Sequence, residues 1–251
     1  MRNPVIIIPA RMASLRLPGK PLADICGLPM IVRVCARAAL AGLGPVVVAA
    51  AEREIAHAVE KAGYPVVMTD PDLPSGSDRV HAACKEIDPD GDHDVVINLQ
   101  GDMPTLDPSS LIQLGAALSA FPEADIATLA APITEDAERD DPNVVKAVLS
   151  GHGREGAARA LYFSRATVPT GPGPVWHHVG VYAFRRDALD RFVAAPQSPL
   201  EGRERLEQLR ALEIGMTIAC AVLKGEPPNG VDTPEDLAAA RAWYKERGMG
   251  R

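Results

Sequence analysis

A cationic loop near the N-terminus carries the first side chains that could do chemistry. The chain of 251 residues has a net charge of −7. Residues 1–23, by contrast, contain no acidic residue and four basic ones: Arg2, Arg11, Arg16 and Lys20. Such a loop could bind a polyphosphate, with Ser14 and backbone N–H groups as further donors. A basic surface turn is the alternative, because the loop matches neither the GxGxxG fingerprint nor the Walker GxxxxGK(S/T) loop.

A first aspartate, Asp102, follows the buried run at 95–99. We expect Gly101 to let the chain turn sharply, so that Asp102 projects at the carboxyl edge of a sheet. In an open α/β sheet, ligands lie beyond this edge. An ordinary turn aspartate is the alternative interpretation.

A second aspartate, Asp232, lies just before a helix, where an N-cap is the usual role. Thr233 is the better cap, because Pro234 then takes the first helical position and Asp236 completes a capping box. Asp232 is therefore left for another task. Two carboxylates with open coordination positions suit Mg²⁺. The sequence alone does not show that Asp102 and Asp232 meet.

Alternating strands and helices are predicted for the first 120 residues. Short β-branched runs predict strands at 5–8, 46–48, 66–68 and 95–99. Amphipathic runs predict helices at 30–41, 52–62, 78–87 and 108–120. Four βα units indicate a mostly parallel sheet with helices on both faces.

The second half has a different pattern. Strands are predicted at 126–133, 144–149, 160–163 and 179–184, with no good helix between them. Helices follow at 186–193 and 204–212, then a strand at 217–222 and a helix at 234–245. We interpret the chain as a single α/β domain, 1–251, with an inserted antiparallel subdomain at approximately 125–200.

Composition excludes several classes of protein. The longest apolar runs have six residues, at 46–51 and 218–223, whereas a membrane span needs about 20. The acidic net charge argues against nucleic-acid binding. The N-terminus does not fit an export signal, and the four cysteines show no CxxC spacing, so we expect a cytoplasmic protein with reduced thiols.

Seven sequence blocks, in order along nearly the whole chain, resemble the sugar nucleotidyltransferases. Among these the resemblance is to the 3-deoxy-manno-octulosonate cytidylyltransferases, or CMP-Kdo synthetases. The blocks are IIIPARMASLRLPGKPL, PSGSDR, NLQGD, LYFSRA, HVGVY, LEQLR and GVDTPEDL. One block alone would be weak support, but seven in order make a strong case.

The resemblance implies a Rossmann-like nucleotidyltransferase fold and CTP-dependent activation of Kdo with release of pyrophosphate. It implies that Asp102 and Asp232 hold Mg²⁺, and that both are catalytic together with Arg11 and Lys20. The nucleotide-binding residues would be Ala10, Arg11, Ser14, Arg16, Lys20, Ser75, Gly76, Arg79 and Gln100. The sugar-binding residues would be Gln100, Arg165, His178, Glu207 and Gln208. A homodimer and a role in lipopolysaccharide biosynthesis are also implied.

The sugar-side residues also have structural interpretations. Arg165 could pair with any acid, and Glu207 and Gln208 could form an exposed helix face. His177 and His178 are not expected to ligate one metal jointly, because neighbouring strand residues point to opposite faces. We expect His178 alone in the pocket.

Two departures from the family pattern affect the expected site. Ala49, Ala50 and Ala51 stand where the family usually has a Thr-Asp pair, and Met103 stands where many members have an acid. A non-catalytic nucleotide-binding paralogue is therefore an alternative. Another is an enzyme for a different acidic sugar, of the sialic-acid or amino-Kdo type. A glycosyltransferase is a weaker one, because it would need a DxD-like metal motif and none that follows a strand is convincing.

Overall fold

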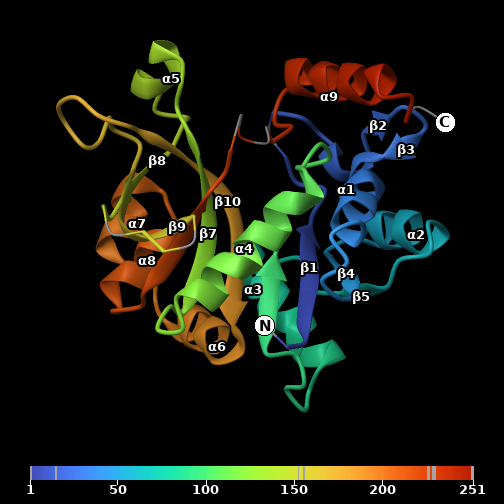
Figure 1. Ribbon diagram of the computed structural model, residues 1–251. Helices are drawn as coiled ribbons and strands as arrows, with labels where there is room; N and C mark the ends of the chain where they lie inside the picture. The colour runs from blue at the N-terminus through green and yellow to red at the C-terminus, as the bar shows by residue number, and fades with distance from the viewer. Residues whose placement is uncertain are drawn as a thin grey trace. The chain divides into compact units, whose positions relative to one another are not determined.

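The chain forms two compact units in a computed structural model (Figure 1). The parallel-sheet unit comprises Arg2–Leu111 and Pro228–Arg251, and the mixed-sheet unit comprises Ile112–Pro227. The structure describes residues 2–14, 16–151, 153–154, 156–224, 227 and 230–249. Leu15 of the first motif lies outside the described residues. The compact mixed-sheet unit is longer than the insert expected at 125–200.

The parallel-sheet unit contains the four strands that periodicity predicted. They are β1 (Pro4–Ala10), β4 (Val46–Ala50), β5 (Val66–Met68) and β6 (Val95–Asn98). They lie in the order β5-β4-β1-β6, and every neighbouring pair is parallel. The predicted strands and their parallel pairing are therefore confirmed.

Helices cover both faces of these strands. They are α1 (Met30–Ala39), α2 (Arg53–Lys61) and α3 (Gly76–Ile87). Right-handed crossovers place α1 and α2 on one face, where the strand order advances outward, and α3 on the other, where the chain returns across β1. Figure 1 shows α1 and α3 on opposite sides of β1. This two-sided cover explains why all residues of β4 and β6 are buried.

The C-terminal helix α9 (Pro234–Glu246) packs on a small hairpin, β2 (Asp24–Ile25) and β3 (Leu28–Pro29), as Figure 1 shows. A short 3₁₀ helix, η1 (Lys20–Leu22), precedes this hairpin. Ile25, Met30, Leu237 and Tyr244 share one buried cluster. Helix α9 is thereby fixed against residues 24–30.

The mixed-sheet unit follows α4 (Pro108–Ala120), the helix in which the chain passes between units. Its five strands lie in the order β10-β7-β11-β9-β8. They are β7 (Ile126–Pro132), β8 (Lys146–Leu149), β9 (Ala157–Ser164), β10 (Trp176–Arg185) and β11 (Ile218–Val222). Its helices are α5 (Asp136–Asp140), α6 (Arg186–Ala194), α7 (Pro199–Glu204) and α8 (Gln208–Glu213). The chain thus has a mixed α/β fold.

Three expectations for this unit were wrong in detail. Its sheet is not wholly antiparallel. After β10 the chain passes through α6, α7 and α8 before it enters β11, and β11 pairs parallel with β7. A five-residue helix, α5, lies between β7 and β8, where no helix was expected. The helix expected at 204–212 is divided, because Arg205 adopts φ 57° and ends α7 before α8 begins.

No helix among the described residues is both long enough and apolar enough to cross a membrane.

Candidate active site

A pocket of about 320 Å³ opens at the carboxyl ends of β1 and β6, entirely within the parallel-sheet unit. Its size is in the range that small-molecule sites occupy. The lining residues come from the cationic loop, the start of α3, the turn after β6 and the start of α9. They are Pro9, Ala10, Arg11, Ala13, Ser14, Lys20, Pro21, Leu73, Ser75, Gly76, Arg79, Gln100, Gly101, Asp102 and Asp232.

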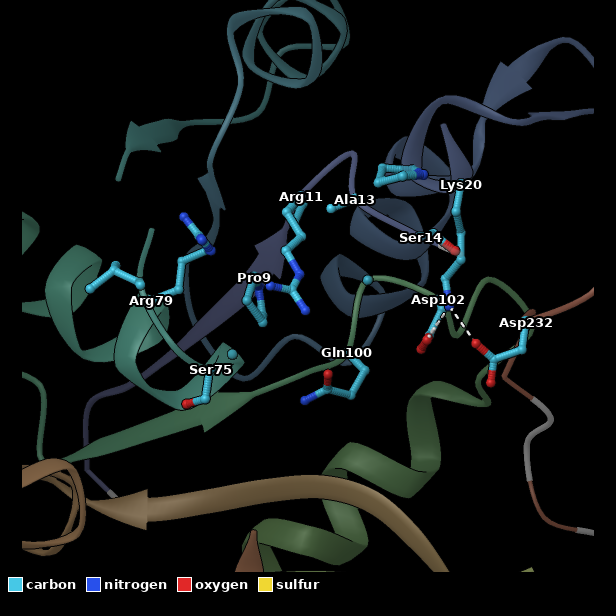
Figure 2. A pocket seen from close by; sticks show the side chains of 15 residues that line it. Pro9, Arg11, Ala13, Ser14, Lys20, Ser75, Arg79, Gln100, Asp102 and Asp232 are labelled. Carbon is cyan, nitrogen blue, oxygen red and sulfur yellow. Dashed lines mark hydrogen bonds and ion pairs between the residues drawn. The ribbon is translucent and has the colours of Figure 1, made fainter. Parts of the chain in front are cut away.

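The Lys20 ammonium lies between the two aspartates. Its Nζ donates to Asp102 Oδ2 at 2.6 Å and to Asp232 Oδ1 at 2.9 Å (Figure 2). The two carboxylates therefore converge on one cation, although 130 positions separate them in the sequence. Arg16 adds an ion pair to the other side of Asp232, with Nη2 3.0 Å from Oδ2.

Asp232 is positioned by the turn that leads into α9. The Val231 N–H donates to the Asp102 carbonyl at 2.8 Å, which ties this turn to the end of β6. Asp236 Oδ2 accepts from the backbone N–H groups of Asp232 and Thr233, and the Asp236 N–H donates to Thr233 Oγ1. The predicted capping box is confirmed, and it leaves the Asp232 carboxylate directed toward the pocket.

Gly101 acts differently from what we expected. Its φ is not in the left-handed region, so no turn there requires glycine. Instead, a Cβ at Gly101 would lie 3.1 Å from the Pro9 carbonyl oxygen and 3.3 Å from Ile31 Cδ1. The glycine allows the turn after β6 to approach β1 closely, and this approach brings Asp102 beside the cationic loop.

Lys20 remains charged in this setting. Burial alone would lower its pKa, but the Asp102 and Asp232 carboxylates more than offset that effect and raise the pKa above its usual value. The side chain is 14% exposed, and that of Asp102 is 26% exposed. Lys20 is thus a protonated, largely covered counter-ion for both aspartates.

Arg11 is a cation of the pocket that no carboxylate of the described residues neutralises. It has no ion-pair partner among the residues that the structure describes, and Figure 2 shows its side chain extending between Pro9 and Gln100. Ser14 lies nearby in the loop, and its Oγ accepts from the Leu17 N–H at 3.3 Å. An anion entering the pocket would meet a guanidinium whose charge is not yet neutralised.

The start of α3 forms another wall of the pocket. Ser75 caps the helix, accepting from the Asp78 N–H at 3.2 Å and donating its hydroxyl to Asp78 Oδ2 at 2.6 Å. The helix begins at Gly76, two residues earlier than the sequence predicted. A Cβ at Gly76 would lie 3.5 Å from Pro9 Cγ, so the wall is closely packed.

Arg79 lines this wall but turns its guanidinium away from the pocket centre. It donates to Thr69 Oγ1 at 2.5 Å and to the Asp70 carbonyl at 3.0 Å. Burial, followed by repulsion from Arg11, lowers its pKa, and Glu52 opposes that effect. In this arrangement Arg79 supports the segment that leads to Leu73 and Ser75. Gln100 is fixed separately, because its Nε2 donates to Asn98 Oδ1 at 3.1 Å.

Glu52 is a site-related residue that the sequence analysis missed. Its Oε2 accepts from the Met12 N–H at 2.9 Å and so ties the cationic loop to the end of β4. The signal was an acid directly after Ala49, Ala50 and Ala51, which are all buried. Glu52 therefore supplies a carboxylate at this edge of the sheet, although the Thr-Asp pair is missing. Met103 is buried and packs rather than facing the pocket as a ligand.

In the mixed-sheet unit, His178 lies in a buried polar and aromatic cluster. Its Nε2 is 2.9 Å from Thr128 Oγ1, and its Nδ1 is 3.4 Å from Gln208 Nε2. The Tyr182 hydroxyl donates to Gln208 Oε1 at 3.2 Å, and Phe163 packs edge-on against the imidazole. Burial, followed by the neighbouring His177, lowers the pKa of His178 to about 3. The imidazole is therefore neutral at neutral pH.

Arg165 extends from the end of β9. Its Nε donates to the Glu204 carbonyl and its Nη1 to the Pro142 carbonyl, each at 2.9 Å. These acceptors orient the guanidinium without neutralising its charge. Strand β8 links Arg165 to His178, because Lys146 pairs with Ser164 of β9 and with His177 of β10.

Gln208 is buried rather than part of an exposed helix face. Glu207 N-caps the same helix, α8, with Oε1 3.9 Å from Arg210 Nη2. The mixed-sheet unit thus gathers His178 and Gln208 directly and orients Arg165 by separate contacts.

The aspartate pair fits a hard cation. Among the described residues no group of three or more His, Cys, Asp or Glu could hold a metal, so the protein offers two carboxylates here rather than a closed cage. Both carboxylates already bind one cation, the Lys20 ammonium. Mg²⁺ commonly takes one or two carboxylates plus phosphate oxygens and waters.

Comparison with known proteins identifies the class. The cytidylyltransferase family model matches residues 5–218, and the chain belongs to that family. A 3-deoxy-manno-octulosonate cytidylyltransferase from Parvibaculum lavamentivorans is 62% identical over 98% of this chain and 95% of its own length. One from Paramagnetospirillum magneticum is 57% identical over 97% of this chain and 98% of its own length.

A solved structure is similar along almost the whole chain. It is described as CMP:2-keto-3-deoxy-manno-octonic acid synthetase complexed with CTP. It superposes with a TM-score of 0.89 at 37% identity, covering 98% of this chain and 99% of its own. The resemblance in seven sequence blocks and the assignment to nucleotidyltransferase enzymes are therefore confirmed.

Proposed function

We propose that this chain transfers the cytidylyl group of CTP to 3-deoxy-D-manno-octulosonate, giving CMP-Kdo and pyrophosphate. The observation that carries the proposal is the pocket at the carboxyl ends of β1 and β6. Its lining joins two cations of the first loop, Arg11 and Lys20, to two convergent carboxylates. Arg16 is not among the lining residues but pairs with Asp232. The relatives' names supply the nucleotide and the sugar, and they favour this substrate over the alternatives.

The reaction is an in-line displacement at phosphorus. The anomeric hydroxyl oxygen forms a bond to the α-phosphorus of CTP, and the bond from that phosphorus to the oxygen that bridges to the β-phosphorus breaks. Pyrophosphate leaves with that bridging oxygen, and the hydroxyl proton passes to water. No protein nucleophile is required. Mg²⁺ held by Asp102 and Asp232 would supply the Lewis acid that polarises the α-phosphate and makes the hydroxyl more acidic.

The cationic loop binds the triphosphate and stabilises the leaving group. Arg11 offers an uncompensated guanidinium, and Arg16 and Lys20 exchange their aspartate partners for phosphate oxygens. Ala10 and Ser14 place loop donors beside the phosphates. Charge that grows on pyrophosphate during bond breaking would then be stabilised by cations that CTP binding has already brought to its phosphates.

The nucleoside would lie against the start of α3 and the turn after β6. Ser75, Gly76 and Gln100 line this part of the pocket directly. Arg79 holds the adjoining segment through Thr69 and the Asp70 carbonyl. Their positions at the carboxyl edge of a parallel sheet support a Rossmann-like manner of nucleotide binding.

The acidic sugar would be bound by residues of the mixed-sheet unit, namely Arg165, His178, Glu207 and Gln208. Arg165 has the charge to attract a sugar carboxylate, because the hydrogen-bond acceptors of its guanidinium in the described structure are carbonyl oxygens. His178 and Gln208 are neutral hydrogen-bonding groups suited to sugar hydroxyls. Glu207 can accept from further hydroxyls.

The proposal is tested by pyrophosphate release from the purified protein. Each of the four ribonucleoside triphosphates is assayed with Kdo, with a sialic acid and with an amino-Kdo, in Mg²⁺ and in EDTA. We expect release only with CTP, Kdo and Mg²⁺. Release only with the sialic acid or only with the amino-Kdo would identify that sugar, rather than Kdo, as the substrate. CTP binding without release under any condition would indicate a binding protein instead.

A further inference from the structure

We propose that the Lys20 ammonium is an internal competitor of the divalent cation at the Asp102–Asp232 pair, so that the metal binds strongly only after CTP has drawn Lys20 away. The inference rests on the proposed function, which supplies CTP as the ligand of the pocket. In this scheme CTP binds before the metal and each strengthens the binding of the other. Lys20 neutralises the two aspartates in the ligand-free protein.

The geometry carries the proposal. Lys20 Nζ is 2.6 Å from Asp102 Oδ2 and 2.9 Å from Asp232 Oδ1, so one charged nitrogen lies within hydrogen-bond distance of both carboxylates (Figure 2). A cation bridging the same two oxygens would occupy the same space. The ammonium and a bridging metal ion therefore exclude one another, and Lys20 must move before the metal can bridge the pair.

Electrostatics makes this exchange costly without a new partner for Lys20. The lysine side chain is only 14% exposed, so a displaced ammonium would need another anion or access to water. Asp102 has no second basic partner among the described residues, whereas Asp232 keeps Arg16 at 3.0 Å. Lys20 is thus the principal neutralising group of the pair.

CTP can supply the missing partner. Lys20 lines the same pocket as Arg11 and Ser14, so a triphosphate bound there presents several anionic oxygens to its flexible four-carbon stem. When Lys20 moves to phosphate, the two aspartates are left facing each other without their shared cation. Their affinity for a divalent cation then rises. Because coupling between two ligands is reciprocal, the metal must strengthen CTP binding by the same factor.

The test measures binding of Mn²⁺, a paramagnetic substitute for Mg²⁺, by electron paramagnetic resonance. Wild-type protein is titrated without CTP and with saturating CTP, in the absence of sugar so that no turnover occurs. The decisive variant is Lys20→Met, which keeps an unbranched side chain, one atom shorter, and removes its charge. Arg16→Met is the matched control, because it removes a cation from Asp232 without touching the space between the carboxylates.

We expect Lys20→Met to bind Mn²⁺ about tenfold more tightly than wild type when CTP is absent. Arg16→Met should tighten binding by less than about threefold, since Lys20 remains between the carboxylates. Adding CTP should tighten Mn²⁺ binding to wild type far more than CTP tightens it to Lys20→Met. The double variant Lys20→Met with Asp102→Asn should lose the gain, which would place the metal at this pair.

Equal Mn²⁺ affinity of wild type and Lys20→Met without CTP would overturn the proposal. A Lys20→Met protein that has lost its thermal unfolding transition would be replaced by Lys20→Gln and judged by the same comparison. The outcome is separable from that of the proposed function. Tighter Mn²⁺ binding by Lys20→Met, with no pyrophosphate release from wild type, would support the competition and reject the proposed reaction. Pyrophosphate release from wild type, with equal Mn²⁺ affinity of the two proteins, would support the reaction and reject the competition.

Discussion

The pocket of the parallel-sheet unit is held together by ion pairs, whereas the His178 cluster of the mixed-sheet unit is held together by hydrogen bonds between neutral groups. In the pocket, Lys20, Asp102 and Asp232 are charged and partly exposed, and each is neutralised by another. In the cluster, His178 and Gln208 are buried and neutral, and hydrogen bonds rather than ion pairs connect them.

This difference indicates how each region would respond to a ligand. Ion pairs among pocket residues can be exchanged for ion pairs to phosphate and metal, so the pocket is arranged for rearrangement. A buried neutral network gains nothing from rearranging, because any group that loses its partner there costs about 1–3 kcal/mol. The cluster is therefore arranged for fixed geometry.

The largest expected effect tests the ion pairs of the pocket. Asp102→Asn removes one of the two carboxylates that converge on Lys20, and we expect kcat to fall about 10³-fold, since charge stabilisation at the reacting phosphate is lost. Steady-state kinetics at saturating CTP and Kdo give the number. Asp90→Asn, in an exposed turn, is the control and should be unchanged. Full Mg²⁺-dependent activity in Asp102→Asn would sink the metal assignment.

The next effect tests the neutral state of His178 through the pH dependence of stability. The pKa of His178 is about 3 in the folded protein and about 6.5 when unfolded, so the unfolded state binds the proton first. Stability from this group is complete above pH 6.5 and is lost as pH falls from 6.5 toward 3. Between pH 7.5 and pH 5 the loss should be about 2 kcal/mol.

Urea unfolding of wild type and His178→Gln at both pH values measures this contribution. The variant lacks the titrating group but can still hydrogen-bond, so its stability should fall by about 2 kcal/mol less than that of wild type. His177, whose pKa burial also lowers, is present in both proteins and cancels in the comparison. Parallel pH profiles would mean that His178 is not held neutral by its surroundings.

A third effect separates the two regions kinetically. Lys146 is fully buried, and its ammonium donates to the Asp141 carbonyl at 2.6 Å and to the Arg165 carbonyl at 3.3 Å. Lys146→Met leaves these acceptors without their donor and should loosen Arg165. We expect the KM for Kdo to rise about tenfold, with the KM for CTP unchanged, because one unmade hydrogen bond costs about 1–3 kcal/mol.

The same reaction assay, with each substrate varied in turn, gives both constants. Lys85→Met, on the surface of α3, is the matched control and should alter neither. Equal increases in both KM values, with a lowered unfolding temperature, would indicate a general loss of structure rather than a displaced Arg165.

The two regions also differ in how far the sequence predicted them. The parallel-sheet strands and the capping box at Thr233 followed from period, β-branching and cap chemistry, which are local properties. The meeting of Asp102 with Asp232 did not, because it depends on the Val231–Asp102 backbone hydrogen bond across the fold. Only the family resemblance implied that contact.

In the mixed-sheet unit, even local signals were insufficient. Nothing in periodicity shows that Arg205 takes a positive φ and divides the expected helix at 204–212. Lys146 falls in the strand predicted at 144–149, but its burial follows from pairing with both β9 and β10. The missed Glu52 had a sequence signal, but its contact with the Met12 N–H depends on where β1 and β4 end.

The smallest expected effect concerns the scaffold beneath the charged pocket. The Tyr244 hydroxyl of α9 donates to the Pro104 carbonyl at 2.6 Å, and Arg33 stacks on its ring at 4.4 Å from the centroid. Tyr244→Phe removes the hydroxyl and keeps the ring. We expect a loss of about 1 kcal/mol in unfolding free energy, the usual net worth of one buried hydrogen bond.

The KM for CTP should change less than about twofold in Tyr244→Phe, because the Val231–Asp102 hydrogen bond and the α9 capping box still hold Asp232 in place. Urea unfolding and CTP kinetics test both parts. Tyr64→Phe, at a tyrosine whose hydroxyl has no partner among the described residues, controls for the substitution itself. If CTP binding weakened in proportion to stability, the charged pair would depend on distant packing, and the contrast between a rearrangeable pocket and a fixed cluster would fail.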